Sequence, residues 1–179
     1  MEKLKRGYVE VYTGNGKGKT TSALGTALRA VGIGLKVYMV QFLKGGSSSE
    51  LYSIEKLKPY FEVFNFESER GFFWNLSEKE KIELKKEVQK EYNFCIELMQ
   101  KKECDILIMD EIFGALEDKL ISERQIIDLI EKKPENIEII LTGRNAPQSV
   151  IDKADLVTEM KKVKHYFDKG VNARRGIEY

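Results

Sequence analysis

A short run of glycines and lysines has the residue types needed to hold a chain of phosphates. It reads Thr13-Gly-Asn-Gly-Lys-Gly-Lys-Thr-Thr21 and follows an apolar segment typical of a strand. Glycines let the backbone approach phosphate oxygens closely, and the loop amides and the helix N-terminus after them favour an anion. The ending Gly18-Lys19-Thr20 matches a Walker A motif, although Gly14 comes one residue later than the usual spacing requires. The alternative is a glycine-rich turn without a ligand.

The side chains of this loop predict how a nucleoside triphosphate would be held. The Lys19 ammonium is expected to contact the phosphates and to lie near solvent before they bind. The Thr20 hydroxyl is a suitable ligand for Mg²⁺. We predict eight residues that contact ATP: Gly14, Asn15, Gly16, Lys17, Gly18, Lys19, Thr20 and Thr21.

Two adjacent carboxylates supply the second half of the site. Asp110 and Glu111 follow the apolar run Ile106-Leu-Ile-Met, which resembles a Walker B strand. Such a strand brings carboxylates beside the phosphate loop, where they hold magnesium directly or through water. We therefore predict a site for Mg²⁺ (or Mn²⁺) made by Thr20, Asp110 and Glu111, and we count Lys19, Thr20 and Glu111 as catalytic. The alternative is a strand that ends in two solvated acids.

The elements that must position these residues alternate between strands and helices. Strands are expected at 7–13, 36–42, 61–66, 105–109 and 138–142, with 155–160 as a candidate sixth, and helices at 19–31, 50–58, 78–101 and 122–132. Ser77 and Glu80 form a capping-box pattern at the start of the long helix. The alternation predicts an α/β, P-loop NTPase-like three-layer fold with a mainly parallel central sheet of five or six strands, as a single domain over 1–179. Ligands are then expected at the carboxyl ends of the strands.

Composition argues against several classes of partner. The 179 residues carry a net charge of about +1, which offers no field to attract nucleic acid. No apolar run approaches the roughly 20 residues that span a bilayer, and Met1–Arg6 is too charged for a signal peptide, so we expect no membrane partner and a cytoplasmic protein. Cys95 and Cys104 lack a disulfide or metal pattern and are expected to be buried thiols in a reducing compartment.

Several motifs together resemble the P-loop class of corrinoid adenosyltransferases, over almost the whole chain. They are Gly14-Asn-Gly-Lys-Gly-Lys-Thr-Thr21, Val40-Gln-Phe-Leu-Lys-Gly45, Gly71-Phe-Phe-Trp74, Asp110-Glu111, Leu141-Thr-Gly-Arg144, Val163-Lys-His-Tyr-Phe-Asp168 and Gly176-Ile-Glu-Tyr179. The resemblance implies transfer of the 5′-deoxyadenosyl group of ATP to the Co(I) centre of a corrinoid, cobalamin or a biosynthetic precursor, with release of triphosphate. It also implies an electron donor, such as a reduced flavoprotein, and a homodimer.

The resemblance assigns the corrinoid contacts to aromatic residues. Phe72 and Trp74 are expected to displace the lower axial ligand of the corrinoid, although such a cluster could equally be a small satellite core. The chain departs from the family at Phe73 and at Ile112-Phe113-Gly114. It also has only six residues before Gly7, so that the N-terminal cover of longer members must be absent or supplied by another segment.

Two other classes of function compete with this reading. A P-loop small-molecule kinase or ATPase would need an acceptor-positioning residue and a lid with several arginines, but the stretch before the long helix has only Arg70. A nucleotide-switched binding protein would perform no chemistry. Two further residues stay open: Arg144 could reach ATP phosphates or pair with an acid, and His165, the single histidine, is expected to be structural or to support the site indirectly.

Overall fold

The computed structural model describes residues 3–46, 48–68, 71 and 73–179, and its centre is a parallel sheet. Six strands hydrogen-bond in the order β3-β2-β4-β5-β1-β6, and every recorded pair is parallel. The predicted α/β architecture is thus confirmed, including its sixth strand. The strands are β1 (Val9–Thr13), β2 (Val37–Gln41), β3 (Phe61–Phe64), β4 (Ile106–Asp110), β5 (Glu138–Thr142) and β6 (Leu156–Glu159).

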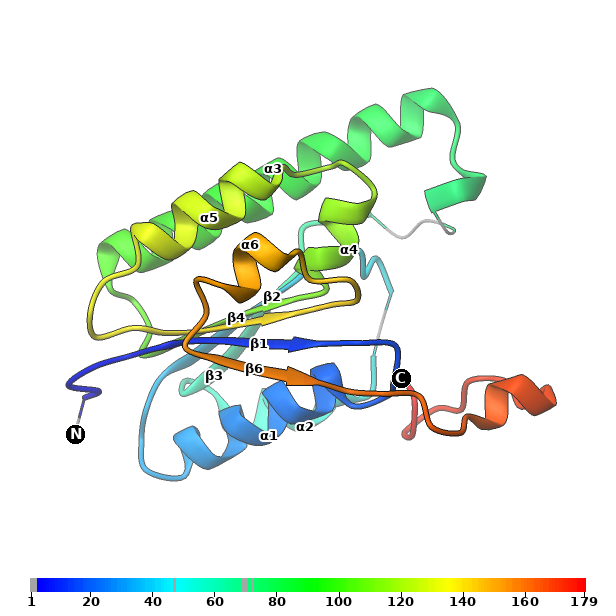
Figure 1. Ribbon diagram of the computed structural model, residues 1–179. Helices are drawn as coiled ribbons and strands as arrows, with labels where there is room; N and C mark the ends of the chain where they lie inside the picture. The colour runs from blue at the N-terminus through cyan, green and yellow to red at the C-terminus, as the bar shows by residue number, and fades with distance from the viewer. Residues whose placement is uncertain (1–2, 47, 69–70, 72) are drawn as a thin grey trace.

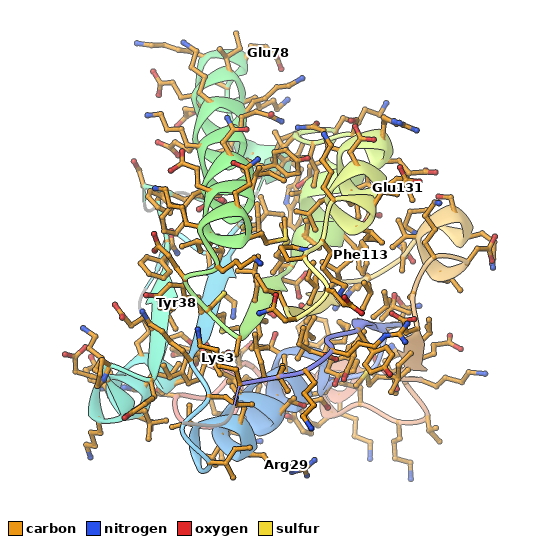
Figure 2. All side chains as sticks on the ribbon, turned by 90° about the vertical axis from the view of Figure 1, so that its left-hand side faces the viewer. Lys3, Arg29, Tyr38, Glu78, Phe113 and Glu131 are labelled. Atoms are coloured by element: carbon orange, nitrogen blue, oxygen red, sulfur yellow. The ribbon has the colours of Figure 1, made fainter. Side chains whose placement is uncertain are left out.

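Helices cover both faces of this sheet, which gives the three layers (Figure 1). One face carries α1 (Lys19–Val31) and α2 (Glu50–Ile54), and the other carries α3 (Glu78–Lys101), α4 (Ile112–Glu117), α5 (Glu123–Glu131) and α6 (Gln148–Ile151). Each layer boundary has its own apolar cluster, the larger one under α3 and α5. Figure 2 marks the two sides, with Phe113 on the side of α3 and α5 and Arg29 on α1. None of the helices in the described ranges is long and apolar enough to cross a membrane.

Helix starts were predicted well where a capping box was present. The Ser77 side chain accepts a hydrogen bond from the Glu80 N–H, and the Glu80 carboxylate accepts one from the Ser77 N–H. The same reciprocal pair joins Ser122 and Gln125 at the start of α5. Each such cap contributes about 1 kcal/mol by satisfying amides that the first turn leaves free.

Several elements differ from the prediction. The helix expected at 50–58 ends at Ile54 and continues as a 3₁₀ turn, Glu55–Leu57. Strand β3 ends at Phe64, because the Phe66 N–H donates to the Glu91 carboxylate instead of to a neighbouring strand. The short helices α4 and α6 were not expected, since four to six residues are too few to display a helical period.

Glu91 gives the stability of this fold an expected pH dependence. It is 0% exposed on the inner face of α3, and burial, reinforced by the charge of Glu67, raises the pKa of Glu91 from 4.5 to about 9. A carboxyl whose folded-state pKa lies above its unfolded value loses stabilising free energy as pH rises between the two values. We therefore expect Glu91→Gln, which cannot ionise but keeps an acceptor for the Phe66 N–H, to be more stable than wild type at pH 8 by about 1–3 kcal/mol.

Urea unfolding at pH 4.5 and pH 8 measures this difference. The two proteins should be nearly equally stable at pH 4.5, where wild-type Glu91 is protonated in the folded state. Glu83→Gln, an exposed position on the same helix, serves as the matched control and should follow wild type at both values. The same gap between wild type and Glu91→Gln at both pH values would contradict ionisation as the cause.

The strand order brings the expected site residues to one edge of the sheet. Strand β5 lies between β1, which leads into the phosphate loop, and β4, which ends in Asp110. Since all strands are parallel, the loops after β1, β2, β4 and β5 leave from the same edge. The chemistry of this chain is therefore to be sought there.

Candidate active site

The phosphate loop is held in a conformation that needs glycine at two positions. Gly14 and Gly18 have φ values of 99° and 124°, which side chains rarely tolerate. Added Cβ atoms at Gly14 and Gly16 would lie 2.4 and 2.8 Å from the Met160 carbonyl oxygen. The Gly16 N–H donates to that same oxygen at 2.7 Å. The loop therefore rests against the chain leaving β6, and this packing leaves no room for a side chain at Gly14 or Gly16, whereas at Gly18 only the φ value favours glycine.

Lys19 does not lie near solvent, contrary to the prediction. Its side chain points back into the loop, where the ammonium donates to the carbonyl oxygens of Gly14 and Gly16 at 2.8 and 2.9 Å. Only 7% of the residue is exposed. Burial lowers the pKa of Lys19, partly offset by the charge of Glu111. The expectation was wrong because it counted phosphates as the only acceptors within reach, whereas the loop carbonyls also bind the ammonium.

Asp110 is the central acceptor of the polar contacts at this edge. Its Oδ1 accepts hydrogen bonds from the hydroxyls of Thr20 at 2.8 Å and Thr142 at 2.7 Å. Its Oδ2 lies 3.0 Å from the Lys44 ammonium. Asp110 is fully buried, so these three donors compensate for the loss of water around its charge. The phosphate-loop threonine and the acid after β4 thus meet directly.

Glu111 lies beside Asp110 and faces an open cavity. It has a left-handed backbone, φ 61°, which starts α4, and its N–H donates to the Thr142 hydroxyl at 3.0 Å. Burial and the neighbouring charge of Asp110 raise the pKa of Glu111. A cation arriving beside these two carboxyls would relieve their repulsion.

This group of oxygens fits Mg²⁺ bound together with phosphates. Thr20, Asp110 and Glu111 offer only oxygen ligands, which this ion prefers, and Lys44 already supplies positive charge at Asp110. Within the described ranges no three or more His, Cys, Asp or Glu side chains converge as a metal cluster. A magnesium ion here would therefore depend on phosphate oxygens and water for most of its coordination.

Two cavities open above the phosphate loop and share several lining residues. One, of about 300 Å³, is lined by the loop from Asn15 to Thr21 and by Arg144 and His165. The other, of about 580 Å³, is lined by residues that include Thr20, Glu111 and Ser53. Arg144 lines the first cavity, and its positive charge partly offsets the rise in the pKa of Glu111. The His165 Nδ1 accepts a hydrogen bond from the Phe167 N–H, in keeping with a structural role.

C-terminal residues line the same two cavities, Gly176 to Tyr179 the larger one and Ile177 and Glu178 the smaller one. The Lys17 ammonium donates to the Ile177 carbonyl oxygen at 3.1 Å, and the Ser49 hydroxyl donates to the Tyr179 main-chain oxygen at 2.8 Å. Glu178 is held by Arg174 and Tyr166, and this contact lowers the pKa of Glu178 to about 2. These contacts hold the C-terminal motif Gly176-Ile-Glu-Tyr179 beside the phosphate loop, a position that sequence reasoning had not assigned to it.

A third cavity, of about 380 Å³, lies beside the aromatic loop. It is lined by residues that include Leu43, Lys44, Glu67, Phe73 and Trp74. The Trp74 residue is 74% exposed, so a role in a satellite core does not describe it. Phe73 does pack against the core under α3, with Lys81 over its ring. Phe72, the other predicted corrinoid contact, lies outside the described residues.

Lys44 was missed in the sequence. It was quoted only as part of the motif Val40-Gln-Phe-Leu-Lys-Gly45, without a role of its own. In the structure its ammonium lies between Asp110 and Glu50, at 3.0 and 3.5 Å. Burial lowers the pKa of Lys44, but the Asp110 charge and hydrogen bond outweigh that effect and leave it raised. A lone lysine in a glycine-rich loop gives no signal of such a partner in a distant strand.

Comparison with known protein families gives one match that spans nearly the whole chain. A family model described as ATP:corrinoid adenosyltransferase BtuR/CobO/CobP matches residues 5–179. A corrinoid adenosyltransferase of Escherichia coli strain K12 is 34% identical over 176 residues, which cover 98% of this chain and 87% of that protein. The corrinoid adenosyltransferase of Pseudomonas aeruginosa PAO1 is 33% identical and covers 98% of this chain and 85% of its own length.

Similarity to solved structures concerns the fold. The RadB recombinase superposes with a TM-score of 0.54 at 16% sequence identity, covering 90% of this chain and 78% of that one. At this identity the likeness supports the P-loop type of α/β fold and carries no information about the reaction.

Proposed function

We propose, because the chain belongs to the ATP:corrinoid adenosyltransferase family, that its phosphate loop holds the triphosphate of ATP while the corrinoid approaches from the cavity beside Trp74. The protein is a transferase that moves the adenosyl group of ATP to a corrinoid. A kinase or ATPase reading is not favoured.

The reaction requires the protein to neutralise the phosphate charge and to align the reacting atoms. The electron pair of Co(I) forms a bond to C5′ of ATP, the C5′–O bond breaks, and its electron pair leaves with triphosphate. No proton moves, so a general base is not required. The protein must stabilise the phosphate charge and hold the reacting atoms in line. Lys19, the loop amides and Arg144 supply the first requirement, and the partly enclosed cavities support the second.

Magnesium would bind with the nucleotide at Thr20, Asp110 and Glu111. The supporting observation is the oxygen cluster in which the Thr20 hydroxyl bonds to Asp110. The ion would neutralise phosphate charge there. Residues Gly14 to Thr21 are proposed to contact ATP, and Phe72 with Trp74 to contact the corrinoid. We also propose that the protein is a homodimer and that it receives electrons from a reductant such as a reduced flavoprotein. A cytoplasmic location is supported by two buried, unpaired cysteines.

The single observation that carries the nucleotide part is the junction of the phosphate loop with Asp110 at one sheet edge. The test is a product analysis with ATP, Mg²⁺ and a chemically reduced corrinoid. Formation of adenosylcorrinoid with one equivalent of intact triphosphate is expected. Formation of ADP or phosphate without a cobalt–carbon bond would exclude it and support a kinase or ATPase.

Thr20→Val tests the magnesium assignment. Valine keeps the branched shape of threonine but removes the oxygen that bonds to Asp110. We expect the Mg²⁺ concentration for half-maximal activity to rise roughly tenfold, since one ligand and one buried hydrogen bond are lost. ATP affinity measured in EDTA should change much less.

Thr26→Val is the matched control for this experiment. Thr26 lies on the same helix and its hydroxyl is within 3.4 Å of the Tyr12 hydroxyl, away from Asp110. Its magnesium titration should match wild type. If Thr20→Val also titrated like wild type, Thr20 would not be a magnesium ligand.

A further inference from the structure

Lys44 occupies the boundary between the two kinds of cavity in this site. It lines the cavity of about 580 Å³ with Thr20 and Glu111, and it lines the cavity of about 380 Å³ with Trp74. Of the described residues that line these two spaces, Lys44 alone is common to both. A side chain at this position can meet groups on either side of the boundary.

The reaction places its breaking bond at this same boundary. The inference rests on the proposed function, in which the triphosphate lies in the phosphate loop and cobalt lies beside Trp74. C5′ must then lie between the two, and the oxygen that leaves it belongs to the phosphate nearest the boundary. As the C5′–O bond breaks, its electron pair adds negative charge to that oxygen. A cation placed there before the reaction would stabilise the transition state more than the bound ATP.

The Lys44 ammonium is the available cation on the boundary. It lies 3.0 Å from Asp110 Oδ2 and 3.5 Å from Glu50 Oε1, and its side chain is 28% exposed. Lys19 is less available, because it is buried in the phosphate loop with two carbonyl partners. A lysine ends in a compact charge on a flexible stem, so its ammonium can turn from Asp110 to a phosphate without moving the loop.

We propose that Lys44 is a catalytic residue: its ammonium leaves Asp110 when ATP binds and neutralises the charge that forms on the leaving triphosphate oxygen. The contact strengthens as the bond breaks, so its loss should appear mainly in kcat. It is distinct from the contacts of the phosphate loop, which hold ATP and the triphosphate alike.

The experiment compares Lys44→Gln with wild type, using chemically pre-reduced cob(I)alamin and saturating ATP and Mg²⁺. We expect kcat to fall about 10- to 100-fold, the effect of one charge-assisted contact. The KM for ATP and the ATP affinity by calorimetry should each change by less than about threefold. Lys44→Arg should keep most of the rate, and added methylammonium should partly restore Lys44→Ala. Lys101→Gln, which removes an exposed charge paired with Glu97, should behave like wild type.

A role limited to holding Asp110 would give a different pattern. The defect of Lys44→Gln would then be a raised Mg²⁺ requirement, and its kcat would reach the wild-type value once Mg²⁺ is raised far enough to saturate the variant. A wild-type kcat under those conditions would overturn the inference. Failure of wild type itself to form adenosylcobalamin and triphosphate in this assay would instead count against the proposed function, so the two failures are distinguishable.

Discussion

Lys19→Ala is expected to abolish productive ATP binding while the sheet stays folded. The Lys19 ammonium lies in the phosphate loop on the Gly14 and Gly16 carbonyl oxygens, from which it can turn to phosphate oxygens. A hydrogen bond to a charged group contributes about 1.5–3 kcal/mol, so a tenfold to hundredfold loss of ATP affinity is the least expected. The variant also loses the two hydrogen bonds from Lys19 to the loop carbonyl oxygens, which should add to the loss.

Calorimetric titration with ATP and Mg²⁺ measures this effect, and circular dichroism checks the fold. Lys17→Ala provides a comparison within the same loop. The Lys17 side chain is exposed and bonds the Ile177 carbonyl oxygen, so its removal should weaken ATP binding less than removal of Lys19. Equal affinity in wild type and Lys19→Ala would show that the nucleotide does not use this loop.

A mainly parallel sheet of five or six strands could be predicted because most strands carry a local signal, whereas the strand order was not predicted. Buried runs such as Ile106–Met109 are apolar throughout, as strands covered on both faces must be. The start of the long helix α3 could be predicted from the capping-box residues Ser77 and Glu80. The helices α4 and α6 carried no such signal, because they follow from the turn at Glu111 and from Pro147 and not from a period.

The candidate site divides in the same way between local and distant interactions. The phosphate loop and Asp110 could be identified in the sequence because residue type and spacing suffice, and the structure brings Thr20 and Asp110 into contact. Lys44 and the C-terminal residues could not, since their roles arise from contacts between segments far apart in the chain: Lys44 with Asp110, and Ser49 with Tyr179. The burial of Lys19 was not predicted for a different reason: the loop carbonyl oxygens that bind its ammonium were not considered as acceptors.

Substitution of Trp74 is the second change with a large expected effect, and this effect should fall on the corrinoid and not on ATP binding. Cob(II)alamin with an axial ligand resists reduction, because the added electron must enter an orbital that the ligand raises. A bulky apolar ring can replace the ligand without donating electrons, and an apolar wall offers water no hydrogen bond at the vacant position. Trp74 lines the cavity beside Lys44 and is 74% exposed, so a planar substrate can reach it.

Trp74→Ala is therefore expected to lower adenosylation much more with cob(II)alamin and a reductant than with pre-reduced cob(I)alamin. A difference of at least about tenfold between the two substrates, with ATP affinity nearly unchanged, would fit a ring that acts before the chemical step. Electron paramagnetic resonance of wild type with ATP and cob(II)alamin should show a four-coordinate species that the variant lacks. Tyr8→Ala, which removes an exposed aromatic ring preceding β1, should retain it. Equal impairment of Trp74→Ala with both oxidation states, or a loss of ATP binding, would mean that Trp74 supports the fold of the loop and not the corrinoid.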